Sequence, residues 1–231
     1  SRCRVDLDPA PATPLFPSAI PWEQARDQFQ FGGTAGSDHE NRLDAFQFTF
    51  ASPYIRWTPE IAAYAAPSFA PGRPVMDAVL DLTQRINKDF KYDTRTTTVS
   101  TTLPEIMQHR AGVCQDFAHL QIGCLRAMGL AARYVSGYLL TVPPPGKPRL
   151  VGADASHAWL SVYLPHSASF NGTDTAGEWL DLDPTNNCIP GDKHITLAWG
   201  RDFGDVSPLR GVLLGAGKHQ IQVSVDVSPV S

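Results

Sequence analysis

Apolar residues recur at helical spacing along the middle of the chain and predict several helices there. Residues 74–89 form the longest such stretch. Two shorter helices are expected over residues 58–67 and 102–112, where a Thr-Pro-Glu start and a capping box mark their beginnings. A last helix is expected from about Cys114 to Gly129, because its apolar positions repeat at the same spacing.

Alternating apolar and polar residues follow these helices and predict strands. Such runs cover residues 133–140, 156–164 and 177–183, and a final strand is expected over residues 221–227. An earlier alternation predicts one more strand, short and half-buried, through Phe46, Phe48 and Phe50. Several helices followed by several antiparallel strands indicate an α+β domain.

The composition is that of an ordinary globular protein. Apolar residues make up 42% and charged residues 18%, and no stretch approaches the ~20 apolar residues of a membrane span. The net charge is -4 without a Lys/Arg run, which argues against a nucleic-acid partner. The four cysteines show neither CxxC nor Cys/His ligand spacing, so we expect no zinc site or disulfide framework, and a reducing, cytoplasmic location.

Cys114 is the strongest candidate for chemistry in this sequence. It follows Gly112 closely and opens a predicted helix, where unpaired backbone N–H groups and the positive end of the helix dipole favour a thiolate. An arbitrary free cysteine is more often a small buried residue, and Cys124, further along the same apolar stripe, fits that description.

A cysteine nucleophile needs a base and a group that orients the base, and the two runs after it supply both. If the apolar faces of the two strands lie together, opposed residue numbers add to an even sum. Pairing Leu160 with Leu180 brings His157 across from Asp183, whereas a register two residues different brings it across from Asp181. The alternation leaves both acids open. It places the pair on the side of the sheet away from the main apolar face, where the helix N-terminus can dock.

The remaining histidines are assigned to ordinary surface or core positions: His39, His109, His119, His166, His194 and His219. Among them His119 is the sharpest competitor, but its spacing from Cys114 points it away from the helix end. Asp181 is expected to be a solvated or structural acid.

Other polar and aromatic residues have two readings each. Asp116 and Asp154 either shape the rim of a polar pocket or cap backbone groups, and Trp159 and Trp179 either flank the site as an apolar wall or simply pack. Two acids near the C-terminus either bind a cation or hold backbone N–H groups, and here we predict no metal and no cofactor; they are Asp202 and Asp205.

Three blocks in this order resemble the bacterial transglutaminase-like superfamily, whose members include cysteine proteases. They are residues 112–138, the Ser-His-Ala-Trp of residues 156–159, and residues 179–186. The resemblance covers roughly residues 50–228, including residues 200–208.

The resemblance implies a role for one residue of each block. In that family they are the nucleophile, its base and the orienting acid, which here are Cys114, His157 and Asp183. It also implies a papain-like arrangement, with the nucleophile helix packed on an antiparallel sheet. Many members carry an N-terminal β-domain, so we divide the chain into a remnant of that domain with its linker, residues 1–21, and a catalytic domain, residues 22–231.

The function expected from this resemblance is a thiol hydrolase that cleaves amide or peptide bonds in a peptide or protein through a thioester. The expected substrate-binding residues are Gln115, Asp116, Trp159 and Tyr92. The backbone N–H of Cys114 is one expected oxyanion donor, and the second is left unassigned, with Tyr92 as a candidate. Crosslinking transglutaminases carry a tryptophan where this chain has a threonine run, residues 96–102, which favours hydrolysis. The alternatives are acyl transfer to an amine and a non-catalytic peptide-binding module. The sequence leaves the oligomeric state open.

Overall fold

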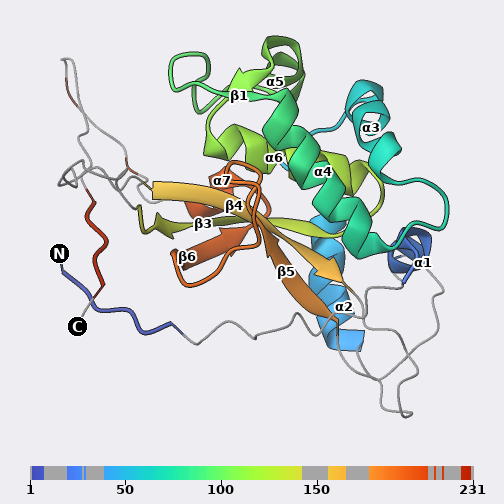
Figure 1. The fold of residues 1–231 in the computed structure, drawn as a ribbon, viewed down its shortest axis with the longest axis horizontal. Helices are drawn as coiled ribbons and strands as arrows, with labels where there is room; N and C mark the ends of the chain where they lie inside the picture. Colours follow the sequence, from blue (N-terminus) through green and yellow to red (C-terminus); the bar gives the residue numbers. More distant parts are fainter. Residues whose placement is uncertain are drawn as a thin grey trace.

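The computed structural model describes residues 2–7, 20–27, 29, 39–141, 156–164, 177–207, 211, 215 and 225–229. Most helices come first and the antiparallel strands of the main sheet follow, as predicted (Figure 1). A short parallel pair of strands also lies among the helices, and one helix follows the last strand. In chain order the helices are α1 (Trp22–Asp27), α2 (His39–Phe46), α3 (Pro59–Ala65), α4 (Val75–Asp89), α5 (Leu103–His109), α6 (Cys114–Ala127) and α7 (Phe203–Val206). The strands are β1 (Lys91–Tyr92), β2 (Ala111–Gly112), β3 (Ala132–Leu139), β4 (Ser156–Leu164), β5 (Glu178–Leu182) and β6 (His194–Gly200).

Helix α6 lies at the centre of the fold. Every residue from Asp116 to Arg126 is buried, because α3, α4 and α5 pack on one side of the helix and β3 and β4 on the other (Figure 1). This cover buries polar side chains of α6 as well as apolar ones, whereas α4 buries mainly the stripe that its sequence predicts. The first residue of the central helix is Cys114, as expected.

The main sheet has four antiparallel strands in the order β5-β4-β3-β6. Strands β4 and β5 pair Leu160 with Leu182 and Val162 with Leu180, an even sum, so the predicted faces are right. The register itself is shifted by two residues from the pairing that we expected, and neither predicted opposition occurs within the ladder. The reason is that β5 ends at Leu182, after which Asp183 leaves the ladder and forms an isolated bridge with Cys188.

Two apolar clusters cover the two faces of this sheet. The larger contains α6 together with Ala158, Leu160, Val162 and Leu182, so the helix packs on the apolar face and not, as expected, on the opposite side. The smaller cluster consists of Phe29, Ala45, Phe48, Ala131 and Tyr163. None of the helices in the described part of the chain has the length and apolar character of a membrane span.

The strand predicted through Phe46, Phe48 and Phe50 is wrong. The chain there continues from α2 into a 3₁₀ turn, η1 (Gln47–Thr49), and a second turn, η2 (Ala66–Ser68), follows α3. The rings of Phe46 and Phe50 lie 5.0 Å apart, and the hydroxyl of Thr49 donates to the carbonyl of Phe46. Alternating phenylalanines therefore reflect tight turns here, with only Phe48 deeply buried.

One helix boundary and several elements also differ from the prediction. Helix α5 ends at His109, before the expected Gly112, because the next residue, Arg110, takes a left-handed conformation with φ of 52°. Strand β6 and helix α7 were not predicted. The strand expected over residues 221–227 falls mostly outside the described residues, and residues 226–229 form no strand.

Candidate active site

The start of α6 presents Cys114 beside a tightly packed turn. A Cβ on Gly112 would lie 2.6 Å from Oδ2 of Asp116, so only glycine leaves room for this carboxylate. The same oxygen accepts the backbone N–H of Val113 at 2.8 Å and the hydroxyl of Thr97 at 2.6 Å. Cys114 itself is half-buried at the first helical position, where the backbone N–H groups lack partners within the helix.

Asp183 is held by the turn that follows β5. Its Oδ1 accepts the backbone N–H groups of Thr185 at 2.9 Å and Asn186 at 3.2 Å, an arrangement that Asp commonly makes in turns. The side chain of Asn87, on α4, donates to the carbonyls of Pro184 and Thr185 and so ties this turn to the helical layer. The carboxylate is fully buried and fixed in direction.

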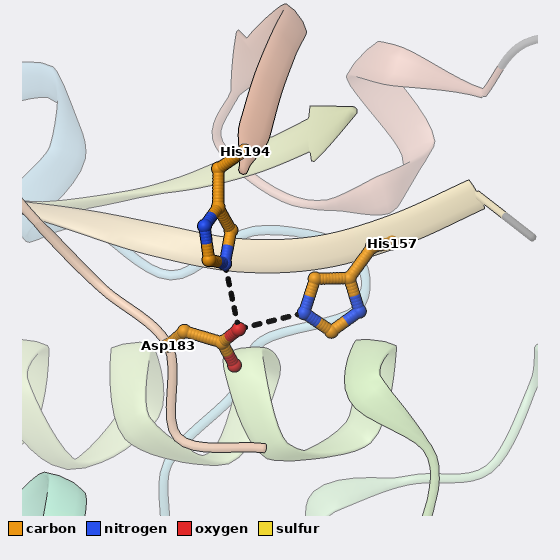
Figure 2. A group of neighbouring side chains, drawn as sticks. All are labelled: His157, Asp183 and His194. Atoms are coloured by element: carbon orange, nitrogen blue, oxygen red, sulfur yellow. Dashed lines mark hydrogen bonds and ion pairs between the residues drawn. The ribbon is translucent and has the colours of Figure 1, made fainter. Parts of the chain in front are cut away.

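His157 and Asp183 meet although they do not pair across the sheet. His157 Nε2 lies 2.8 Å from Asp183 Oδ2, and both side chains are buried (Figure 2). The contact joins the second residue of β4 to the residue just beyond the end of β5. Nε2 therefore donates to the carboxylate, which leaves Nδ1 for other partners.

The charges of the site favour an ionised pair. Burial alone would lower the pKa of His157, but hydrogen bonds with Asp183 and with Cys114, together with their charges, raise it to about 9. Burial would likewise raise the pKa of Asp183, yet the hydrogen bonds from His157 and His194 hold that pKa well below its usual range. Hydrogen bonds with a carboxylate and with a thiol thus favour the imidazolium form of His157.

His194 is a residue of this site that the sequence reasoning missed. Its Nε2 lies 3.0 Å from the same oxygen of Asp183, and its side chain is 7% exposed (Figure 2). Asn186 adds a third donor, with its amide nitrogen 2.6 Å from that oxygen and 3.3 Å from Nε2 of His157. Asn186 stands in a block that resembles the family, but no spacing in the sequence marks His194.

His157, Asp183 and His194 are also a group with the ligand types of a metal site, and their ligand atoms lie within 4.8 Å of one another. Hydrogen bonds already account for this convergence. A metal-bound histidine almost always donates its other ring nitrogen to a neighbour, whereas Nδ1 of His194 is buried with no partner among the described residues. The group therefore fits a hydrogen-bonded carboxylate better than a metal.

The residues expected to bind substrate are placed differently from one another. Tyr92 is 52% exposed, and the partial burial of its side chain, together with the nearby Cys114, raises its pKa. The side chain of Gln115 donates to the carbonyl of Val99, within the threonine-rich loop. Asp116 is 1% exposed and caps the helix, which favours the capping interpretation over a pocket rim.

Trp159 lies behind the site and forms no exposed wall. It is fully buried, its ring centroid lies 6.0 Å from that of His157 and 5.2 Å from that of His194, and its Nε1 donates to Asp181 at 3.1 Å. Asp181 also accepts the hydroxyl of Ser161. This acid has a structural role in the sheet and does not contact His157.

The competing residues have partners of their own. His119 is buried, which lowers its pKa to about 4, and its Nε2 accepts the backbone N–H of Phe203. Asp202 accepts backbone N–H groups of Tyr54 and Gly204, and Asp205 pairs with Arg201. Asp154, His166 and His219 lie outside the described residues.

Comparisons with known proteins agree with this fold. The model of the transglutaminase-like superfamily matches residues 62–184. An uncharacterized protein of Mycobacterium tuberculosis strain H37Rv is 45% identical over 229 residues, which are 97% of this chain and 68% of that protein. Another from Mycobacterium leprae is 34% identical over 154 residues, 65% of this chain and 50% of that protein.

A solved structure extends the likeness to three dimensions. The crystal structure of a "Putative Cysteine Protease" from Cytophaga hutchinsonii superposes with a TM-score of 0.56 and 28% identity, over 71% of this chain and 49% of that chain. An α+β core with a cysteine at the start of a central helix and an antiparallel sheet beside it defines a papain-like class of fold. The chain belongs to the transglutaminase-like superfamily.

Proposed function

We propose that this chain is a thiol hydrolase that cleaves amide or peptide bonds with Cys114, His157 and Asp183. The observation that carries the proposal is the buried hydrogen bond of 2.8 Å between His157 and Asp183. The side chain of Cys114 is hydrogen-bonded to the same imidazole. A thiolate needs a neighbouring cation and helix N–H groups, and this position supplies both.

The reaction follows from the placement of these groups. The Cys114 sulfur attacks a carbonyl carbon, and the oxygen takes up the negative charge beside the backbone N–H of Cys114, with Tyr92 as the second donor. The carbon–nitrogen bond then breaks as His157 gives its proton to the departing amine, which leaves a thioester on sulfur. Water attacks the thioester, His157 takes the proton from this water, and the acid product leaves with the thiolate restored.

Selective alkylation tests the nucleophile without a known substrate. At pH 7 we expect iodoacetamide to label Cys114 at least about 10-fold faster than the exposed Cys3, which serves as an ordinary thiol within the same chain. Burial raises the pKa of Cys124 to about 12, and burial together with Asp183 raises the pKa of Cys188, so neither should compete. Mass spectrometry of peptides gives each rate.

The same measurement on His157→Ala separates the enzyme from a binding module. We expect Cys114 to react in this variant no faster than Cys3, because the imidazolium that holds the thiolate is gone. Equal labelling of Cys114 and Cys3 in the unsubstituted chain would contradict the proposal. With a glutamine-containing peptide, ammonia release without incorporation of a fluorescent amine identifies hydrolysis, and incorporation identifies acyl transfer.

A further inference from the structure

The carboxylate of Asp183 receives more donors than its contact with His157 requires. Oδ1 is occupied by two backbone N–H groups, and Oδ2 is shared by His157, His194 and Asn186 at 2.8, 3.0 and 2.6 Å. An oxygen that accepts three hydrogen bonds is a weaker acceptor for each of them than one that accepts a single bond, because the donors draw on the same negative charge. His194 therefore competes with His157 for one atom.

The position of His194 depends on an irregularity in β6. Strand β3 pairs Ser136 with Ala198, but the next pair joins Gly137 to Thr196, so Leu197 is an extra residue in the ladder. Such a bulge reverses which face the following side chains point to. Beyond it His194 lies opposite Leu139, a place that Ile195 would take in a regular ladder.

The bulge thereby brings the two histidines to one side of the sheet. His157 pairs with Gly137, and alternate residues of β3 share a face, so the partners of Gly137 and Leu139 do as well. A Cβ on Gly137 would collide with the carbonyl of Ile195 and with the Trp159 ring, so glycine permits this close approach. The ring of Trp159 packs edge-to-face against the ring of His194, with the ring centroids 5.2 Å apart.

We propose that His194 is a positioning residue that takes a share of Asp183 Oδ2 and so limits how strongly this carboxylate holds the proton of His157. The inference rests on the proposed function, in which His157 must release that proton to a departing amine. A general acid works best when its pKa lies near the working pH, so an acceptor that bound His157 alone would hold the proton too tightly. Among the residues that the structure describes, the thiols of Cys114 and Cys188 interact with this pair.

The test is the pKa of His157, measured by NMR from the pH titration of its ring nitrogens. All chains carry Cys114→Ala, so that the thiol bonded to the imidazole is absent, and Cys188 is unchanged in every chain that is compared. We expect His194→Leu to raise the pKa of His157 by about 0.5 to 1 unit, because Oδ2 then has one donor fewer. His194→Gln keeps an N–H donor near the same place and should leave the pKa within about 0.2 units of the parent value.

The sign of the shift distinguishes this role from a purely structural one. If His194 only kept the site folded, its loss would break the contact between His157 and Asp183 and lower the pKa of His157 toward about 6.5. An unchanged or lowered pKa in His194→Leu overturns the proposal. The exposed His109, substituted as His109→Leu, is the matched control and should have no effect.

A second measurement applies if His194→Leu does not fold. In the unsubstituted chain the ring of His194 should carry its proton on Nε2, with a proton resonance shifted downfield by the bond to Asp183. A proton found on Nδ1 instead would overturn the proposal. Neither NMR measurement needs turnover. If Cys114 is not selectively alkylated, the proposed function fails, and the NMR measurements still decide the role of His194.

Discussion

His157 and Asp183 stabilise each other's charged forms inside the protein, and this affects folding as well as chemistry. Their side chains are buried, where an unpaired charge is costly, and the short contact between them compensates for that cost. Asn186 and His194 complete the partners of the carboxylate. Both oxygens of the Asp183 carboxylate are therefore satisfied by protein donors.

The raised pKa of His157 predicts how stability depends on pH. A histidine with a raised folded pKa stabilises the native state fully below its unfolded pKa near 6.5, and this stabilisation is lost as the pH rises through the folded pKa. In the Cys114→Ala chain, Asp183 remains to raise the pKa of His157, so we expect the free energy of unfolding to fall by about 1 to 2 kcal/mol between pH 6.5 and 9.

Urea denaturation at several pH values checks this expectation. Adding His157→Gln to the Cys114→Ala chain removes the titrating group, and the slope over this range should largely disappear. An equally steep fall in both chains would show that the pH dependence belongs to other residues.

At the scale of elements, the start of α6 is joined to the loop before α5. Asp116 accepts both the N–H of Val113 and the hydroxyl of Thr97, and Gln115 donates to the carbonyl of Val99. Two residues that the sequence offered for substrate binding thus fasten the threonine-rich loop beside Cys114. Through that loop they can shape the approach to the sulfur.

Substitution of Asp116 tests this connection. Asp116→Ala removes the helix cap and leaves the Thr97 hydroxyl without its partner, so we expect a loss of about 1 to 2 kcal/mol in the free energy of unfolding. Burial raises the pKa of Asp116 even though Thr97 and Val113 bind the charged form, so a neutral acceptor suits the site. Asp116→Asn should therefore retain most of the stability, and guanidinium denaturation measures both variants.

Asp116→Ala is also expected to loosen the loop before α5. Faster proteolysis of residues 93–102 would follow if the loop loses its attachment to α6. A loop cleaved at the same rate in Asp116→Ala and in the unsubstituted chain would contradict the connecting role.

At the scale of the whole molecule, α6 packs between the other helices and the sheet. Its side chains contact both layers, and Gly123 lies so close to α5 that a Cβ there would be 2.7 Å from Leu103. Cys114, the proposed nucleophile, stands at the start of this buried helix, and the packing of α6 on β4 fixes its place relative to His157. Stability and site geometry therefore depend on the same packing.

Leu125→Ala measures how much that packing contributes. Leu125 is fully buried in the larger cluster, so its truncation should cost about 2 to 5 kcal/mol in the free energy of unfolding. Leu43→Ala, at an exposed position of α2, is the control and should cost less than about 0.5 kcal/mol. Comparable losses in the two variants would contradict the central place of α6.

The local pattern of the sequence determined the type and approximate bounds of α3, α4, α6, β3, β4 and β5. Their periodicity, proline starts and capping residues act within a few positions of each other, so the prediction needs no distant contact. The same locality put Cys114 at the first residue of α6. The strand prediction from alternating phenylalanines was wrong because a tight turn after a helix can carry the same spacing of phenylalanines as a strand.

The family resemblance implied Asp183 as the acid beside His157, but only the tertiary structure decided how the two meet and what else binds that acid. Parity allowed Asp181 or Asp183, and the choice depends on where β5 leaves its ladder, which no spacing reveals. His194 reaches the carboxylate because one extra residue in β6 reverses its face. Strand register and bulges are set by the packing of whole elements against each other, and the order of residues in one strand does not contain that information.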